Sequence, residues 1–221
     1  LFSWHVALAL VGVISLAVSL WFWVSLPASR HFSPCSQSGR ERLQALKRNM
    51  AQPALYSLYA VGFLLLGSFV ALYNYIGYVL MAAPYYLSQT TVGFIFLVYI
   101  VGTFSSTLLG KMTDHIGNGK SLCVSVAVML AGALISLEAP LVLKIAGIAI
   151  FTFGFFGGHT VASSWVGKLA GKEKSQASSL YLLFYYIGAS VLGTLGGKFL
   201  EWYGWNGVVL LVSLSLTGAL L

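Results

Sequence analysis

The stretch GKMTDHIGNGKS at residues 110–121 ends in Gly119, Lys120 and Ser121, the order found at the end of a phosphate-binding P-loop. A P-loop also needs a glycine five residues before its last glycine, so that backbone N–H groups can surround a phosphate. That position holds Asp114, whose carboxylate would repel the phosphate. The sequence therefore argues against a nucleotide site.

Uncharged polar and aromatic residues inside long apolar stretches are the other groups that could contact a ligand. A primary amide in hydrocarbon is costly unless it finds a partner or water, so Asn74 is the strongest candidate, although an interhelical hydrogen bond explains it equally well. Further candidates share helix faces at spacings of three, four and seven: Tyr73, Tyr75 and Tyr78 near Asn74; Thr152, His159 and Ser163; and Ser178, Tyr181 and Tyr185.

The chemistry open to these candidates is limited. The tyrosines could stack on a sugar or an aromatic compound, although packing is the commoner role of tyrosine in membrane helices. His159 lies about 10 Å from the nearer end of its apolar stretch at helical rise, where it could line a vestibule. A lone histidine is a poor metal site, so no metal and no cofactor are predicted. The sequence shows no paired carboxylates and no nucleophile–base pair, which argues against an enzyme.

The composition shows which elements must position these residues. Of 221 residues, 58% are hydrophobic and 8% are charged, and the mean hydropathy is +0.88. A soluble domain has about 25% charged residues. The sequence therefore predicts an all-α integral membrane protein, with room for about seven spans of roughly 20 residues each.

Charged residues and turn signals divide the chain into these spans. The predicted spans lie at 6–26, 54–81, 89–110, 121–137, 145–167 and 175–197, with a last one after EWYGWNG. The AAPYYLSQ segment at 82–89 is the turn between the second and third. The last span has about fifteen residues, short of a crossing, so we expect it to be truncated and the chain to be a piece of something longer.

Basic residues set the orientation. Ten of the 12 Lys and Arg residues lie in the loops 27–53, 110–120 and 167–175, and only Lys144 and Lys198 lie in the other loops. The positive-inside rule places the first set in the cytoplasm, which explains the net charge of +7 without a nucleic-acid partner. The expected outer aromatic belt comprises Trp4, Trp202, Tyr203 and Trp205.

Other features concern the cytoplasmic side and the helix contacts. Cys35 and Cys123 fall near the cytoplasmic face, where thiols stay reduced, so we interpret them as structural. Within the first loop, RERLQALKRN predicts a short amphipathic helix with Leu43 and Leu46 on one face. Small residues at helical spacing predict close packing at Gly102-x₃-Ser106-x₃-Gly110, Gly154-x₃-Gly158 and Ala189-x₃-Gly193-x₃-Gly197.

A long basic loop followed by six spans, with GKMTDHIGNGK between the second and third of them, resembles the carboxyl-terminal half of a major facilitator superfamily transporter. The loop motif of that family is matched by Gly110, Asp114, Gly117 and Lys120, whereas His115 replaces the usual arginine. The stretches YNYIGY, VASSWVGK, SQASSLYLLFYYIGASVLGTLGG and GWNGV are similar to bacterial exporters of the arabinose efflux permease type.

The resemblance implies a domain order and a function. It implies a first transmembrane helix at 1–26, a cytoplasmic central loop at 27–53 and a six-helix bundle at 54–221 whose last helix is truncated. The implied function is secondary transport by alternating access, with efflux of a small solute against protons across a bacterial inner membrane. The implied partners are the lipid bilayer, the solute, protons and the missing amino-terminal half. No Asp or Glu lies deep in a predicted span, so the proton-binding group is expected in that other half.

The resemblance also implies that the loop motif, Gly110, Asp114, His115, Gly117 and Lys120, latches helices on the cytoplasmic side. From the residues themselves, we expect Asp114 to precede the next helix and cap its free N–H groups. His115 would make the latch pH-sensitive, since histidine titrates near ~6.5, unless it is merely solvated. A seven-helix receptor is the alternative function, but no predicted span has the mid-membrane lysine that a retinal Schiff base requires.

Overall fold

The computed structural model describes residues 3–27 and 38–221, so Arg30 and Cys35 lie outside the described residues. The chain divides into two units, residues 1–38 and 39–221, each considered by itself. The first unit contains α1 (Trp4–Ser25), a 22-residue helix with no Asp, Glu, Lys or Arg. Its length and apolarity are sufficient to cross a bilayer.

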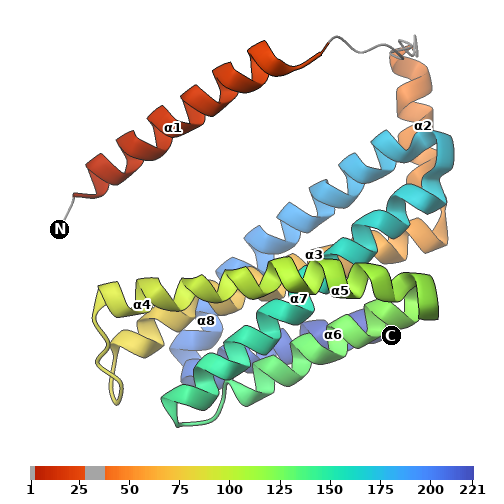
Figure 1. The fold of residues 1–221 in the computed structure, drawn as a ribbon. Coiled ribbons are helices and arrows are strands. Elements are labelled where there is room, and N and C mark those ends of the chain that lie inside the picture. Colours follow the sequence, from red (N-terminus) through yellow and green to blue (C-terminus); the bar gives the residue numbers. More distant parts are fainter. Residues whose placement is uncertain (1–2, 28–37) are drawn as a thin grey trace. The chain divides into compact units, whose positions relative to one another are not determined.

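The second unit is a bundle of helices. Its elements are α2 (Gly39–Ala51), α3 (Pro53–Met81), α4 (Gln89–Ile95), η1 (Phe96–Tyr99), α5 (Ile100–Ile116), α6 (Asn118–Ile135), α7 (Leu141–Ala170), η2 (Gly171–Glu173) and α8 (Lys174–Leu220). In Figure 1, α4 and α5 run end to end as one rod, joined by the 3₁₀ turn η1.

The long helix α8 is two helices that meet at Gly204. This glycine has φ 63° and ψ −150°, outside helical geometry, so the chain turns back there. With this division, six long rods follow α2 in the second unit. The described residues contain no strand, and several helices are apolar and long enough to span a membrane. The predicted all-α polytopic membrane bundle is confirmed.

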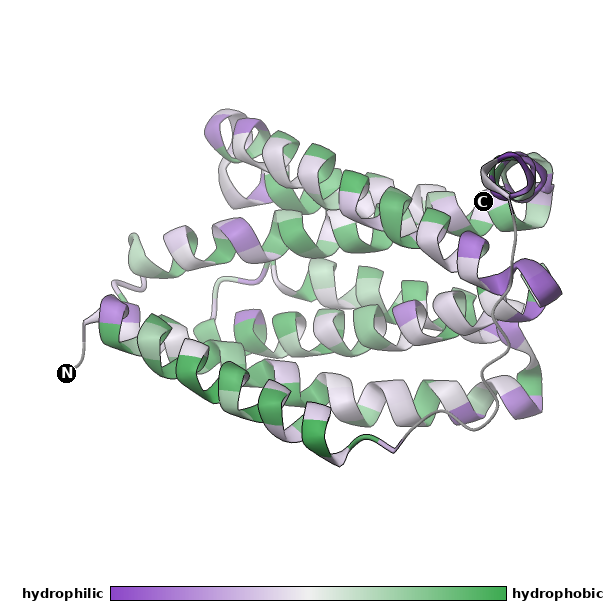
Figure 2. Ribbon diagram, turned by 90° about the horizontal axis from the view of Figure 1, so that it is seen from above, coloured by the Kyte–Doolittle hydropathy of each residue, from purple (hydrophilic) through white to green (hydrophobic). Residues whose placement is uncertain are grey.

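Hydrophilic residues gather toward the ends of the bundle helices, and the middle portions are largely hydrophobic (Figure 2). Helices extend beyond the apolar runs from which the spans were predicted. Lys144 and Lys168, which bounded the predicted span 145–167, both lie inside α7. A lysine at a helix end does not break the helix, because its long side chain carries the charge away from the backbone.

Glycines allow two helix pairs to approach closely. A Cβ on Gly188 of α8 would meet the carbonyl oxygen of Phe63 in α3. A Cβ on Gly154 of α7 would meet the backbone of Met129 in α6. Gly102, Gly158 and Gly193 also lie at helix contacts, as the small-residue spacing predicted. Backbones in direct contact fix the rotation of each helix, and hence which side chains face inward.

The α2 helix lies where an amphipathic helix was predicted, but its rotation differs. Leu46 packs against the core, whereas Leu43 is 54% exposed, and the buried residues are Ala45 and Asn49. The reason is that α2 contacts α3 and α8, so its buried face is set by two helices and not by a flat lipid surface.

An ion pair also attaches α2 to the rest of the bundle. Nε of Arg48 donates a hydrogen bond to Oε1 of Glu173 at 3.1 Å, and a second guanidinium nitrogen contacts the same oxygen. Glu173 belongs to η2, between α7 and α8. Arg48 is largely exposed, so the pair orients α2 more than it stabilises the fold.

Candidate functional site

A hydrogen-bonded chain joins α3 to α7. The hydroxyl groups of Tyr73 and Thr152 are 2.6 Å apart, and Thr152 donates to the carbonyl oxygen of Ile148 at 2.7 Å. A hydroxyl has one hydrogen to donate, so Tyr73 must be the donor to Thr152. Both side chains are buried, and this arrangement satisfies both hydroxyl hydrogens inside the protein.

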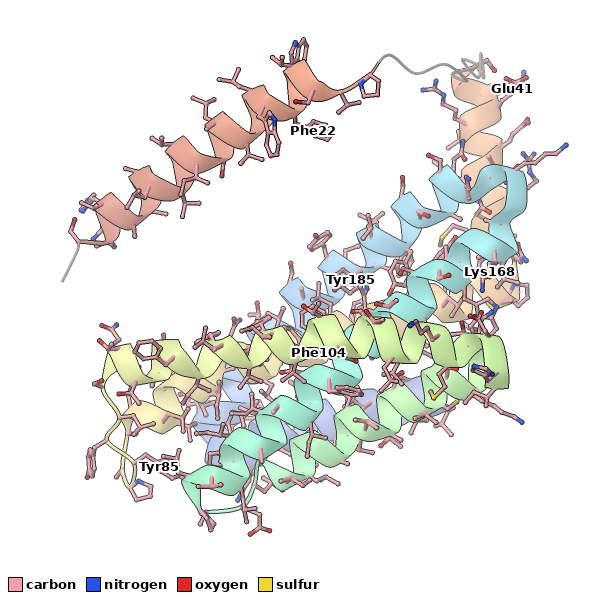
Figure 3. The ribbon with its side chains drawn as sticks, viewed as in Figure 1. Phe22, Glu41, Tyr85, Phe104, Lys168 and Tyr185 are labelled. Atoms are coloured by element: carbon pink, nitrogen blue, oxygen red, sulfur yellow. The ribbon has the colours of Figure 1, made fainter. Side chains whose placement is uncertain are left out.

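A second polar contact joins α7 to the first part of α8. Nδ1 of His159 lies 3.1 Å from the hydroxyl oxygen of Tyr181, and the rings of His159 and Tyr185 have centroids 4.7 Å apart. Figure 3 labels Tyr185 on the first part of α8. Tyr181 is fully buried and Tyr185 is buried, whereas His159 is half-buried. The sequence predicted these three residues as candidates, and the structure brings them together.

Phenylalanines and one further tyrosine connect the two polar contacts. The ring of Phe69 stacks on that of Phe155, with centroids 3.9 Å apart, and its centroid lies 4.5 Å from that of Tyr73. The ring of Phe155 also stacks on that of His159, with centroids 6.3 Å apart. Further ring contacts join these residues to Tyr99, Phe156, Tyr181 and Tyr185. We call the eight residues the aromatic wall: Phe69, Tyr73, Tyr99, Phe155, Phe156, His159, Tyr181 and Tyr185. The wall contains no charged side chain.

The four members that the sequence analysis missed are Phe69, Tyr99, Phe155 and Phe156. One signal was present, because Phe155 lies four residues before His159 and Thr152 lies three residues before Phe155, so all three share a helix face. Phe155 is near the middle of α7, with fourteen residues before it and fifteen after it in the helix Leu141–Ala170. The wall therefore lies about halfway along that helix. Because α7 continues to Ala170, His159 is about 16 Å from that end of the helix, whereas the predicted 10 Å referred to the end of the apolar stretch.

Asn74 and Tyr78 do not join the wall. Asn74 is exposed on α3, and its Nδ2 lies beside Gly193 of α8. Tyr78 is 64% exposed and lines a pocket of about 300 Å³ with Leu200, Gly204 and Trp205. Successive helix positions point about 100° apart, so Tyr73 and Asn74 necessarily face different neighbours. The structure thus divides the predicted candidates between two faces of α3.

A second cluster lies where α6 and α7 connect, on the predicted outer side. Lys144 is only 3% exposed, and its Nζ donates a hydrogen bond to the carbonyl oxygen of Ser136. Nε1 of Trp205 donates to the same oxygen at 2.9 Å. The ammonium also lies 5.7 Å from the Trp205 ring centroid and 5.9 Å from that of Tyr85, within cation–π range.

This cluster corrects two sequence expectations. Lys144 was counted as a loop residue but is buried in the first turn of α7, and Trp205 was placed in the lipid-facing aromatic belt but is 9% exposed. Trp205 directly follows the bend at Gly204, which turns its side chain inward. Trp202 and Tyr203, which precede the bend, are exposed as the belt requires.

The loop motif forms the tight turn between α5 and α6. Gly117 ends α5 and precedes α6 with φ 84°, a conformation that favours glycine. The expectation that Asp114 caps α6 is wrong, because α5 continues to Ile116 and the position before α6 is Gly117, with no side-chain hydrogen bond. Gly110 lies within α5, near Thr160 of α7.

The charged members of the motif lie on the surface of the bundle. Asp114, His115 and Lys120 are exposed, and among the described residues none of them forms an ion pair. The described residues likewise contain no cluster of three or more His, Cys, Asp or Glu side chains that could hold a metal ion. Cys123 is a free, exposed thiol.

Comparison with known proteins identifies the family. The model of the Major Facilitator Superfamily matches residues 64–221, which include the whole aromatic wall and the loop motif. The chain belongs to the major facilitator superfamily. The members of this family are membrane transporters, and the comparisons give no support to the alternative of a seven-helix receptor.

Individual members of the superfamily are similar over the whole chain. The MFS-type transporter YybF of Bacillus subtilis is 50% identical over 99% of this chain and 55% of its own length. The inner membrane transport protein YnfM of Escherichia coli is 48% identical over 100% of this chain and 53% of its own length. A transporter of Buchnera aphidicola is 38% identical over 100% of this chain. The chain spans about half the length of the relatives it matches.

Proposed function

We propose that this chain forms the carboxyl-terminal half, with one preceding helix, of a bacterial inner-membrane exporter that moves a small solute outward in exchange for protons. Membership of the superfamily supports transport, and the name of the Escherichia coli relative supports the inner membrane. Because the relatives are nearly twice as long, the remaining half of the carrier would supply the opposite side of the substrate path. The two halves would then rock about a central site.

The observation that carries this proposal is the aromatic wall. Its side chains come from α3, the η1 turn before α5, α7 and the first part of α8, and it lies about halfway along α7. Superfamily carriers bind substrate near the bilayer midplane, between their two halves. Three rings of the wall are half-buried: Tyr99, Phe156 and His159. A substrate site near the midplane needs side chains at this level that are partly exposed, so the wall suits this role.

The other predicted site residues have roles in the same proposal. Asn74 and Tyr78, exposed on α3, would face the path nearer its outer end. Asp114 and Lys120, exposed at the α5–α6 turn, would find their latch partners in the other half of the carrier. The wall contains no carboxylate, so the proton-binding group of an antiporter would also lie in that half.

The test uses inverted membrane vesicles from cells that express the complete carrier containing this chain. Respiration acidifies the vesicle interior, and a pH-sensitive dye reports the gradient. We expect a transported solute, drawn from a panel of sugars and aromatic compounds, to raise the internal pH by drawing protons out as it enters. Vesicles without the carrier are the control. If no solute moves protons, and labelled solutes do not accumulate either, the carrier is not a proton-coupled exporter.

A further inference from the structure

We propose that the aromatic wall binds a flat, uncharged aromatic solute, and that the solute carries a hydrogen-bond acceptor that contacts Nε2–H of His159. This inference rests on the proposed transport function and adds the chemical class of the solute. Three observations carry it: the tautomer that the buried contact imposes on His159, the internal use of several of the wall's other polar groups, and the partly exposed rings.

The contact with Tyr181 fixes the tautomer of His159. The Tyr181 hydroxyl is buried, and His159 Nδ1 at 3.1 Å is its one hydrogen-bond partner among the described residues. A buried hydroxyl hydrogen without an acceptor is costly, so Tyr181 donates to Nδ1. Neutral histidine then carries its hydrogen on Nε2. Because the ring is half-buried, this N–H is the donor that His159 offers to a solute.

Most other polar hydrogens on this face are already used. Tyr73 donates to Thr152, Thr152 donates to Ile148, and Ser163 donates to the carbonyl oxygen of Thr160 at 3.2 Å. The hydroxyls of Tyr99 and Tyr185 form no hydrogen bond in the part of the chain that the structure describes. The free groups are therefore the Nε2–H of His159 and two tyrosine hydroxyls, so the wall offers a solute few hydrogen-bond acceptors and no carboxylate or amide oxygen.

This set of groups discriminates between classes of solute. A sugar brings many hydroxyl groups, and each one left without an acceptor at a desolvated wall weakens binding. A cation would be attracted by the ring faces, but the wall has no carboxylate to pair with it, and the partly positive hydrogen of His159 Nε2–H would repel it. A flat aromatic ring can lie against Tyr99, Phe156 and His159, where stacked or edge-to-face contacts add to apolar burial. A carbonyl oxygen on that ring would complete the Nε2–H bond.

The test measures binding of two matched probes to the purified complete carrier by equilibrium dialysis. 7-Methoxycoumarin has two fused rings and a lactone carbonyl, whereas 2-methoxynaphthalene has two fused rings and no carbonyl. We expect the carrier to bind 7-methoxycoumarin about tenfold more tightly, the ratio for one hydrogen bond in a desolvated site. His159→Phe keeps a ring but removes the donor, so it should abolish the preference and leave 2-methoxynaphthalene binding within about threefold.

Two controls separate a specific role of His159 from a general loss of structure. His159→Gln keeps an N–H close to the position of Nε2 and should retain most of the preference. Tyr203→Phe removes an exposed hydroxyl just before the bend at Gly204, far along α8 from Tyr185, and should leave both affinities unchanged. If His159→Phe fails to fold, equal affinity of the unmodified carrier for the two probes would still refute the inference.

Several results would overturn the inference. Equal affinity of the unmodified carrier for the two probes, or an unchanged preference in His159→Phe, would show that His159 does not contact the acceptor. Displacement of 7-methoxycoumarin by L-arabinose at lower concentration than by other coumarins would assign the wall to sugars. Tighter binding of ethidium would assign it to cations. Each of these leaves proton-coupled transport intact, because only the vesicle experiment tests that function.

Discussion

Two glycines of α7 give opposite predictions for the same substitution. A Cβ on Gly154 would meet the backbone N and Cα of Met129 and the carbonyl oxygen of Ser125, all in α6. A Cβ on Gly167 would have no atom of the described residues within 4 Å beyond its own neighbourhood. Gly154→Ala therefore requires α6 and α7 to separate, whereas Gly167→Ala only makes the helix stiffer.

The magnitudes follow from these two situations. Overpacking against backbone atoms, which cannot rotate away as a side chain can, costs about 1–3 kcal/mol of unfolding free energy. Replacing glycine by alanine in an open helical position gains about 0.5–1 kcal/mol. At about 2–4 °C per kcal/mol for a domain of this size, Tm should fall by about 2–12 °C for Gly154→Ala and rise by about 1–4 °C for Gly167→Ala.

The assay is thermal unfolding of the purified complete carrier in detergent, followed by intrinsic tryptophan fluorescence at one scan rate. The two variants serve as controls for each other, since both change glycine to alanine in the same helix. The reasoning is refuted if Gly154→Ala melts at or above the temperature of the unmodified carrier. That result would mean that α6 and α7 are farther apart than backbone contact requires.

Three other predictions address the orientation, the loop motif and Asn74. In a cysteine-free background, cysteines at Ser38 and Lys172 should react only with cytoplasmic reagents and one at Tyr203 only with external reagents; the reverse pattern would invert the topology. Asp114→Asn should slow the transport cycle more than it weakens solute affinity, since it removes a charge at a helix end far from the wall, and a normal turnover rate with a large loss of affinity would contradict this. Asn74→Leu should slow solute transport with an unchanged Tm and little change in solute affinity, because Asn74 would face the path outside the wall; normal transport with a lower Tm would instead make Asn74 a packing residue.

The sequence could predict the helices, their approximate ends and the order in which they follow. In hydrocarbon every backbone N–H and C=O group must be paired within its own segment, so a long apolar run has almost no alternative to a helix. The turns could also be predicted, because Gly117 and residues of the segment 82–89 favour nonhelical geometry. Helix ends were less accurate, since Lys144 and Lys168 stay helical although they are charged.

The sequence also placed several candidate residues on shared helix faces, but it could not say which helices those faces meet. Spacing fixes where a side chain points from its own helix, and nothing in spacing sets the rotation of the neighbour. Tyr73 meets Thr152 across 79 positions of the chain, whereas the adjacent Asn74 turns away. Asp114 was likewise assigned to the start of α6, although it lies in the last turn of α5.

Only the tertiary structure decided these pairings, and the physical reason lies in the glycine contacts. Where α6 touches α7 at Gly154, and α3 touches α8 at Gly188, backbone meets backbone, so each helix has one rotation that avoids a clash. That rotation brings Phe69, Phe155 and His159 into one wall and buries Lys144 beside Trp205. The apolar sequence made the helices, and close packing between particular small residues determined which of their side chains meet.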